Sequence, residues 1–184
     1  MRPLASILVA TCMLQTATAG GEPKHNGHSN PEVLRMKVEQ VGFAGKTGQL
    51  WILDATGAWS VSDFFEKRIS PPSRHGRCSP EQINDLRRVL EASRFSDLPA
   101  SIGAASPVNP QTLEIVVGEK KVICNLEPGK TMQQNRQDLE RSMVPPRSPQ
   151  DLKRLENWDR MIKVEKEIHT LMREPTKPVA TSRR

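Results

Sequence analysis

The chain has 184 residues, and its 27 Lys and Arg against 21 Asp and Glu give a formal net charge of +6 at pH 7. That length suits one domain with tails. The charge is too mild, and the aromatic content of 4%, with no Tyr, too low for the basic stripes and base-stacking surfaces of nucleic-acid-binding proteins. We therefore expect no nucleic-acid partner.

The N-terminus has the three-part pattern of a secretory signal peptide. A basic start is followed by the apolar residues 4–14 and by small residues up to Ala19, which predicts a signal peptide over 1–19 with cleavage between Ala19 and Gly20. Eleven apolar residues are too few to cross a bilayer, which takes about 20, so no transmembrane span is expected. The pattern predicts an exported protein, periplasmic or extracellular. Attachment as a lipoprotein through Cys12 is the alternative.

A flexible linker is expected over residues 20–32, which are rich in Gly, Pro, Asn and Ser. From residue 33 apolar and polar side chains alternate, and this alternation predicts a half-buried strand over 33–41. A glycine-containing turn leads to a second strand over 49–54, and a further turn leads to a third over 58–65. Three strands joined by short turns form an antiparallel meander.

The next segment is expected to be a loop followed by a helix. Pro71-Pro72 and the later Gly76 predict a loop over 67–78. Ser79-Pro80 then offers an N-cap residue with proline at the first helical position, and Gln82 stands at the capping-box position. This helix should end before Phe95.

Two more strands complete the predicted domain over residues 33–127. TLEIVVG and KVICNLE, separated by a turn at Gly118 to Lys120, predict a hairpin. The order is strand, strand, strand, helix, strand, strand. We therefore predict an α+β fold: a five-stranded, mainly antiparallel sheet with one helix packed on it.

The C-terminal part is expected to hold one long helix. Residues 128–148 are polar and predict a linker, with a short helical piece near 136–143. Residues 149–173 predict an amphipathic helix, and 174–184 a disordered tail. The apolar stripe of the helix is formed by Leu152, Leu155, Trp158, Ile162, Ile168 and Leu171, with Met161 and Met172 beside it. This stripe could pack on the domain, pair with another chain or with itself, or lie on a membrane surface.

No residue pattern predicts catalysis. Gly45-Lys46-Thr47 matches the end of a phosphate-binding loop, but the first glycine of that motif is missing and the chain continues as a strand. Two histidines in the linker are too few fixed ligands for a metal site. We therefore expect no enzyme, no metal and no cofactor. Cys78 and Cys124 form a disulfide if they meet in an oxidising compartment; otherwise they are separate buried thiols.

Three short stretches carry a family resemblance: Gly42-Phe43-Ala44-Gly45, Ser79-Pro80-Glu81 and Phe95-Ser96-Asp97-Leu98-Pro99. Their order over residues 34–126 resembles emfourin, a family of small bacterial inhibitors of thermolysin-like (M4) metalloproteases. Where the family usually carries Arg-Ser-Gly, this chain has Glu39-Gln40-Val41.

The resemblance implies a protease-inhibitor-like binding module whose protein partner is a secreted metalloprotease. The candidate contact is Gly42, Phe43, Ala44, Gly45 and Lys46, with Phe43 as apolar anchor and Lys46 at the rim. Phe43 could equally be buried in the core of the sheet. The alternatives are an envelope or scaffold protein that binds a partner or self-associates through its C-terminal helix, and a protein that binds an anionic surface through its basic tail.

Overall fold

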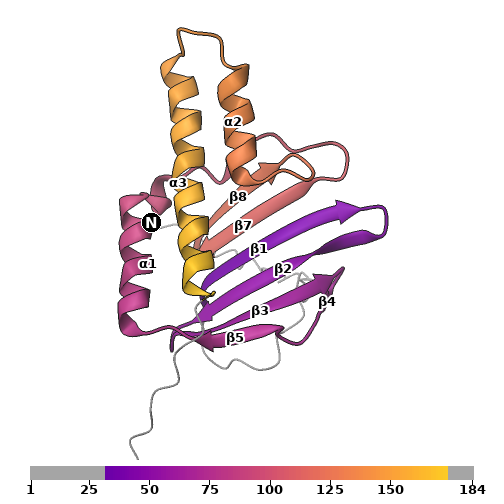
Figure 1. Ribbon diagram of the computed structural model, residues 1–184, viewed down its shortest axis with the longest axis vertical. Helices are drawn as coiled ribbons and strands as arrows, with labels where there is room; N and C mark the ends of the chain where they lie inside the picture. Colours follow the sequence, from indigo (N-terminus) through magenta and orange to yellow (C-terminus); the bar gives the residue numbers. More distant parts are fainter. Residues whose placement is uncertain (1–31, 174–184) are drawn as a thin grey trace, which may run out of the picture.

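The computed structural model describes residues 32–173, in which one mixed sheet carries three α-helices on a single face (Figure 1). The strands are β1 (Glu32–Gly42), β2 (Gly45–Asp54), β3 (Ala58–Phe65), β4 (Arg68–Ile69), β5 (Arg74–Arg77), β6 (Ser101–Ile102), β7 (Gln111–Val117) and β8 (Lys120–Leu126). The helices are α1 (Pro80–Ala92), α2 (Met132–Ser142) and α3 (Pro149–Leu171), with a short 3-10 turn at Phe95–Asp97.

The strands of this sheet follow the order β4-β3-β2-β1-β7-β8-β6, and β5 also pairs with β3. β1 is central and runs antiparallel to both β2 and β7, and among the described strands the only parallel pair is β6 with β8. The predicted α+β class is confirmed. The prediction of five strands was wrong, because β4, β5 and β6 extend the sheet to eight.

The segment 67–78, predicted as a loop, contributes two of the extra strands. β4 and β5 both pair with β3, and Pro71-Pro72 lies between them. Ser70 and Ser73, on either side of the prolines, still donate backbone hydrogen bonds of 2.9 Å to β3. Proline has no N–H to donate, so it is tolerated where an edge strand is interrupted. The prolines break the strand locally without removing the segment from the sheet.

Helix α1 begins and ends where the sequence predicts. The Ser79 side chain accepts from the Gln82 backbone N–H, and the Gln82 side chain accepts from the Ser79 N–H, which completes the capping box. The helix ends at Ala92, before the buried Phe95. Leu86 faces the core cluster of buried side chains between the helices and the sheet. The cap and the apolar stripe therefore act together to place α1.

The polar segment after the sheet, predicted as a linker with a short helical piece near 136–143, forms a regular helix, α2, over Met132–Ser142. Thr131 and Gln134 form a second capping box. Met132 is buried, and the buried Asn135 accepts from the backbone N–H of Glu127 at 2.9 Å. Arg136 pairs with an acidic side chain of α3 at 2.8 Å. Caps and polar contacts stabilise this helix, and an apolar period therefore could not reveal it.

The long helix α3 packs on the sheet beside α1 and α2 (Figure 1). Its bounds agree with the predicted 149–173. Arg160 donates to the backbone carbonyls of Ser93 and Arg94 just after α1, at 2.6 and 2.5 Å. The buried side chains are Leu155, Trp158, Met161, Val164, Ile168 and Leu171, whereas Leu152 is exposed and Ile162 half-buried. Most of the predicted stripe is thus covered by the domain itself.

Several predicted features fall outside the described residues 32–173. They are the signal peptide with its cleavage between Ala19 and Gly20, the alternative lipid attachment at Cys12, nearly all of the predicted linker 20–32, and the tail 174–184. Glu32, at the end of that predicted linker, already belongs to β1. None of the helices in the described part of the chain has the length and apolar character needed to cross a membrane.

Candidate functional site

The predicted contact segment forms the tip of the β1–β2 hairpin. Gly42 pairs with Gly45, and Phe43-Ala44 is the two-residue turn between them. Gly45 has a φ of 116°, a conformation that side chains of L-residues rarely adopt, so glycine is required there. β2 then continues as a strand through Lys46, and Gly-Lys-Thr therefore does not lead into a helix as a phosphate-binding loop would.

Phe43 stands clear of the rest of the described chain. Its relative exposure is 107%, the highest among the exposed large apolar side chains, which rules out burial in the core of the sheet. Large aromatic side chains are usually at least partly buried in a monomer. The fully exposed phenyl ring at the hairpin tip is therefore available to contact an apolar surface of another molecule.

The hairpin tip is braced by Glu66, a residue of the β3–β4 turn that no sequence motif marks. The Glu66 N–H donates to the carbonyl of Lys46 at 2.7 Å, and the Glu66 carboxylate accepts from the Lys46 N–H at 2.8 Å. Glu66 itself has a φ of 55°, unusual for a residue with a side chain. A Cβ at Gly45 would lie 2.0 Å from that carboxylate. The β3–β4 turn thus fixes the base of the tip.

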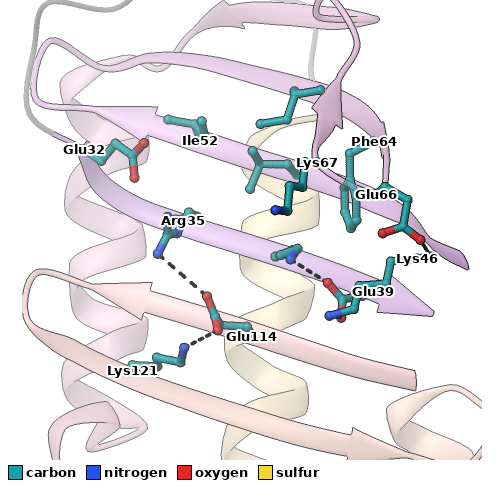
Figure 2. Close-up of a pocket in the computed structure, with 13 residues that line it drawn as sticks. Glu32, Arg35, Glu39, Lys46, Ile52, Phe64, Glu66, Lys67, Glu114 and Lys121 are labelled. Carbon is teal, nitrogen blue, oxygen red and sulfur yellow. Dashed lines mark hydrogen bonds and ion pairs between the residues drawn. The ribbon is translucent and has the colours of Figure 1, made fainter. Parts of the chain in front are cut away.

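A hollow of about 720 Å³ lies on the sheet face opposite the helices (Figure 2). Its floor is a small apolar cluster, separate from the main core, formed by Leu50, Ile52, Phe64 and Ile69. Charged side chains from β1, β2, β7, β8 and the β3–β4 turn surround it: Glu32, Arg35, Lys37, Glu39, Lys46, Glu66, Lys67, Glu114 and Lys121. We call this surface the open face. Lys46 belongs both to it and to the hairpin tip.

The open face carries two groups in which one carboxylate serves two cations. Glu114 pairs with Arg35 at 3.8 Å and with Lys121 at 2.6 Å (Figure 2). Glu39 pairs with Lys37 at 2.6 Å and with Lys46 at 3.4 Å. Each group therefore retains one net positive charge.

The electrostatics of Glu39 show how strongly these cations act. Partial burial disfavours its ionised form, yet the hydrogen bond and charge of Lys37, together with the charge of Lys46, hold the pKa of Glu39 below its usual value. Lys37 also lies over the ring of Phe64, with Nζ 4.8 Å from the ring centroid. The cations thus outweigh the desolvation of the carboxylate, which stays charged at neutral pH.

Cys78 and Cys124 are free, buried thiols, and the structure does not join them. Cys78 follows β5 and donates its backbone N–H to Gly57 beside β3, whereas Cys124 lies in β8. β3 and β8 are four strand steps apart, about 19 Å at about 4.8 Å a step, whereas a disulfide requires Cα atoms closer than about 7 Å. Of the two alternatives, separate buried thiols is the one observed.

Both thiols are expected to be unreactive in the native protein. Burial raises the pKa of Cys78 to about 11, and burial with the nearby Glu165 carboxylate raises that of Cys124 to about 12. Since the thiolate is the reactive species, Ellman's reagent should label neither thiol of a Cys12→Ser variant until urea unfolds it. Rapid labelling of either thiol under native conditions would contradict the burial seen here.

No family model and no curated protein matches the chain. Within residues 32–173, no three or more His, Cys, Asp or Glu side chains gather in a way that could hold a metal ion. His75, close in sequence to Cys78, is exposed on β5 while Cys78 is buried. Two features that are open to solvent and suited to contact are the hairpin tip and the open face.

Proposed function

We propose that this protein is a non-enzymatic, exported binding protein that docks on a protein partner through the tip of the β1–β2 hairpin. The observation that carries the proposal is the complete exposure of Phe43 on a braced two-residue turn. Aromatic side chains that enter a partner's pocket supply much of the binding energy of protein interfaces. A turn already held in one conformation loses little entropy when it docks.

The partner class that we propose is a thermolysin-like metalloprotease, bound in an inhibitor-like manner. The resemblance of residues 34–126 to emfourins supports this choice, and Gly42-Phe43-Ala44-Gly45, one of the stretches that carry it, forms the exposed tip. A narrow tip with one projecting ring suits insertion into a cleft. The predicted export would place both proteins in the same compartment.

The alternative, a scaffold protein acting through its C-terminal helix, has less surface available. The central side chains of the α3 stripe, such as Trp158 and Met161, are buried against the protein's own core. Leu152 and Val144, near the α2–α3 connection, remain exposed and are too few for a helix-pairing seam. The hairpin tip is therefore the better supported contact.

An inhibition assay tests the proposed function. The purified protein, titrated against a thermolysin-like protease with a peptide substrate, should lower the rate in proportion to the inhibitor added. A subtilisin-like serine protease serves as the control and should keep its rate. An unchanged rate of the metalloprotease, together with digestion of the added protein, would contradict the proposal.

A further inference from the structure

We propose that the open face is a second binding site, which takes an extended acidic peptide segment. Carboxylates of the peptide would pair with Arg35 and Lys37, and its apolar side chains would lie on Leu50, Ile52 and Phe64. This site lies on the broad surface of the sheet rather than at the hairpin tip (Figure 2). The inference does not depend on the identity of the partner that Phe43 contacts.

The charge of the open face favours an anionic ligand. Its five cations face four carboxylates, and two of those carboxylates are each shared between two cations. A third carboxylate, that of Glu66, accepts the backbone N–H of Lys46. Lys67, at the same rim, forms no ion pair with any described residue. Added carboxylates would therefore find cations whose pairing is incomplete.

The spacing of these cations matches an extended peptide. Arg35 and Lys37 are two residues apart on β1, so their side chains leave the same face about 6.8 Å apart. Alternate side chains of an extended peptide recur at that same distance. Leu50 and Ile52 on β2 repeat with the same period, directly opposite Lys37 and Arg35. A segment in which acidic and apolar side chains fall on this period would meet both rows.

The protein's own termini are poor candidates for this site. Residues 20–31, which follow the expected cleavage site, contain one acid, Glu22, and one base, Lys24, and residues 174–184 contain Lys177, Arg183 and Arg184 against Glu174. The first segment is therefore neutral, and the second carries two net positive charges. A second copy of the chain, which keeps a net positive charge after cleavage, would also be repelled. Charge complementarity thus points to an acidic segment of another protein.

A peptide suits this surface better than a single-chain amphiphile. The hollow is broad and open to solvent, with charged side chains of both signs around a small apolar floor. A hydrocarbon chain is best held by an enclosed apolar pocket. Ion pairs spread over several strands instead match a ligand that carries charges along its length.

Fluorescence anisotropy with a defined probe tests the site. The probe is a short fluorescein-labelled peptide in which Glu alternates with Val and Thr, and its matched control carries Gln in place of every Glu. The acidic peptide should bind the purified protein, and its affinity should fall as the salt concentration is raised. Failure of the acidic peptide to bind, or equal binding of the Gln peptide, would overturn the proposal. Retention by anionic lipid vesicles without peptide binding would overturn it in favour of a lipid surface.

Matched variants locate the binding. The double variant Arg35→Gln with Lys37→Gln should lower the affinity for the acidic peptide at least about tenfold. The control Arg87→Gln with Arg88→Gln, on the exposed side of α1, removes the same charge and should change this affinity less than about twofold. Equal losses in both double variants would show a net-charge effect and overturn the site.

Two single variants separate this proposal from unfolding and from the hairpin contact. Lys67→Glu, at an exposed residue with no ion pair to a described residue, should lower the affinity for the acidic peptide several-fold without changing the melting temperature of the protein. Unchanged affinity would count against the site. Phe43→Ala should bind the acidic peptide as the native protein does. If Phe43→Ala loses the peptide, the two surfaces form one site and the proposal of a second site is wrong.

Discussion

Phe43→Ala is expected to weaken the complex with a thermolysin-like protease by more than about tenfold and to leave the stability of the protein within about 0.5 kcal/mol of its native value. The side chain contacts almost nothing in the described protein. Its removal therefore creates no cavity and exposes no core. Whatever binding energy the ring supplies comes from the partner, so inhibition and stability should respond independently.

Val144→Ala is the matched control for this prediction. Val144 is also apolar and 83% exposed, but it lies at the α2–α3 connection rather than in the β1–β2 hairpin. Inhibition constants and urea-unfolding curves should be measured for both variants. Equal inhibition by native protein and Phe43→Ala would remove the hairpin tip from the interface. Equal losses for Phe43→Ala and Val144→Ala would leave the contact unlocated.

The regular elements of the fold were predictable wherever local chemistry and periodicity agreed. The capping box of Ser79 and Gln82 marks the start of α1, and Ser148 with Asp151 forms the corresponding capping box at the start of α3. The alternation after residue 33 marks β1, and the glycine pair around Phe43-Ala44 marks its turn. In each case the signal lies within a few residues, and the packing of the element agrees with it.

The remaining elements depend on contacts between distant segments. β4 and β5 exist because β3 offers an edge for pairing, although Pro71-Pro72 argues locally against a strand. β6 has two residues and no period to detect, and it forms only beside β8. The capping box of Thr131 and Gln134 marks the start of α2 locally, but the burial of Met132 and the ion pair of Arg136 with α3 join it to distant segments. No local pattern can report such contacts.

The candidate site was also only partly visible in the sequence. The segment from Gly42 to Lys46 is recognisable as a turn, but the sequence alone does not decide whether Phe43 points inward or outward. Glu66, which braces the tip, lies in another turn about 20 residues later. The ion pairs of the open face required the register of three strands, because Arg35, Glu114 and Lys121 meet only across β1, β7 and β8. In the sequence, only the alternation of charged and apolar residues along β1 indicates that one face of the sheet carries charged side chains.

Met161→Ala is expected to destabilise the protein by about 2–5 kcal/mol, since it deletes a large side chain from a packed interior. Met161 has no exposed surface and belongs to the main core between α3 and the sheet. The three tryptophans, Trp51, Trp59 and Trp158, are all buried in that core. Urea unfolding followed by tryptophan fluorescence therefore reports directly on the region that the substitution disturbs.

Leu152→Ala, in the same helix, is the matched control, because it truncates an exposed rather than a buried apolar side chain of α3. Leu152 belongs to the apolar stripe by sequence but is 52% exposed, so its truncation should change the free energy of unfolding by less than about 0.5 kcal/mol. If both substitutions had the same small effect, α3 would not be packed on the sheet and its stripe would be free to pair with another chain. A large loss for Met161→Ala alone, independent of protein concentration, instead makes α3 part of the domain core. The apolar stripe of α3 would then be closed to partners, unlike the hairpin tip and the open face.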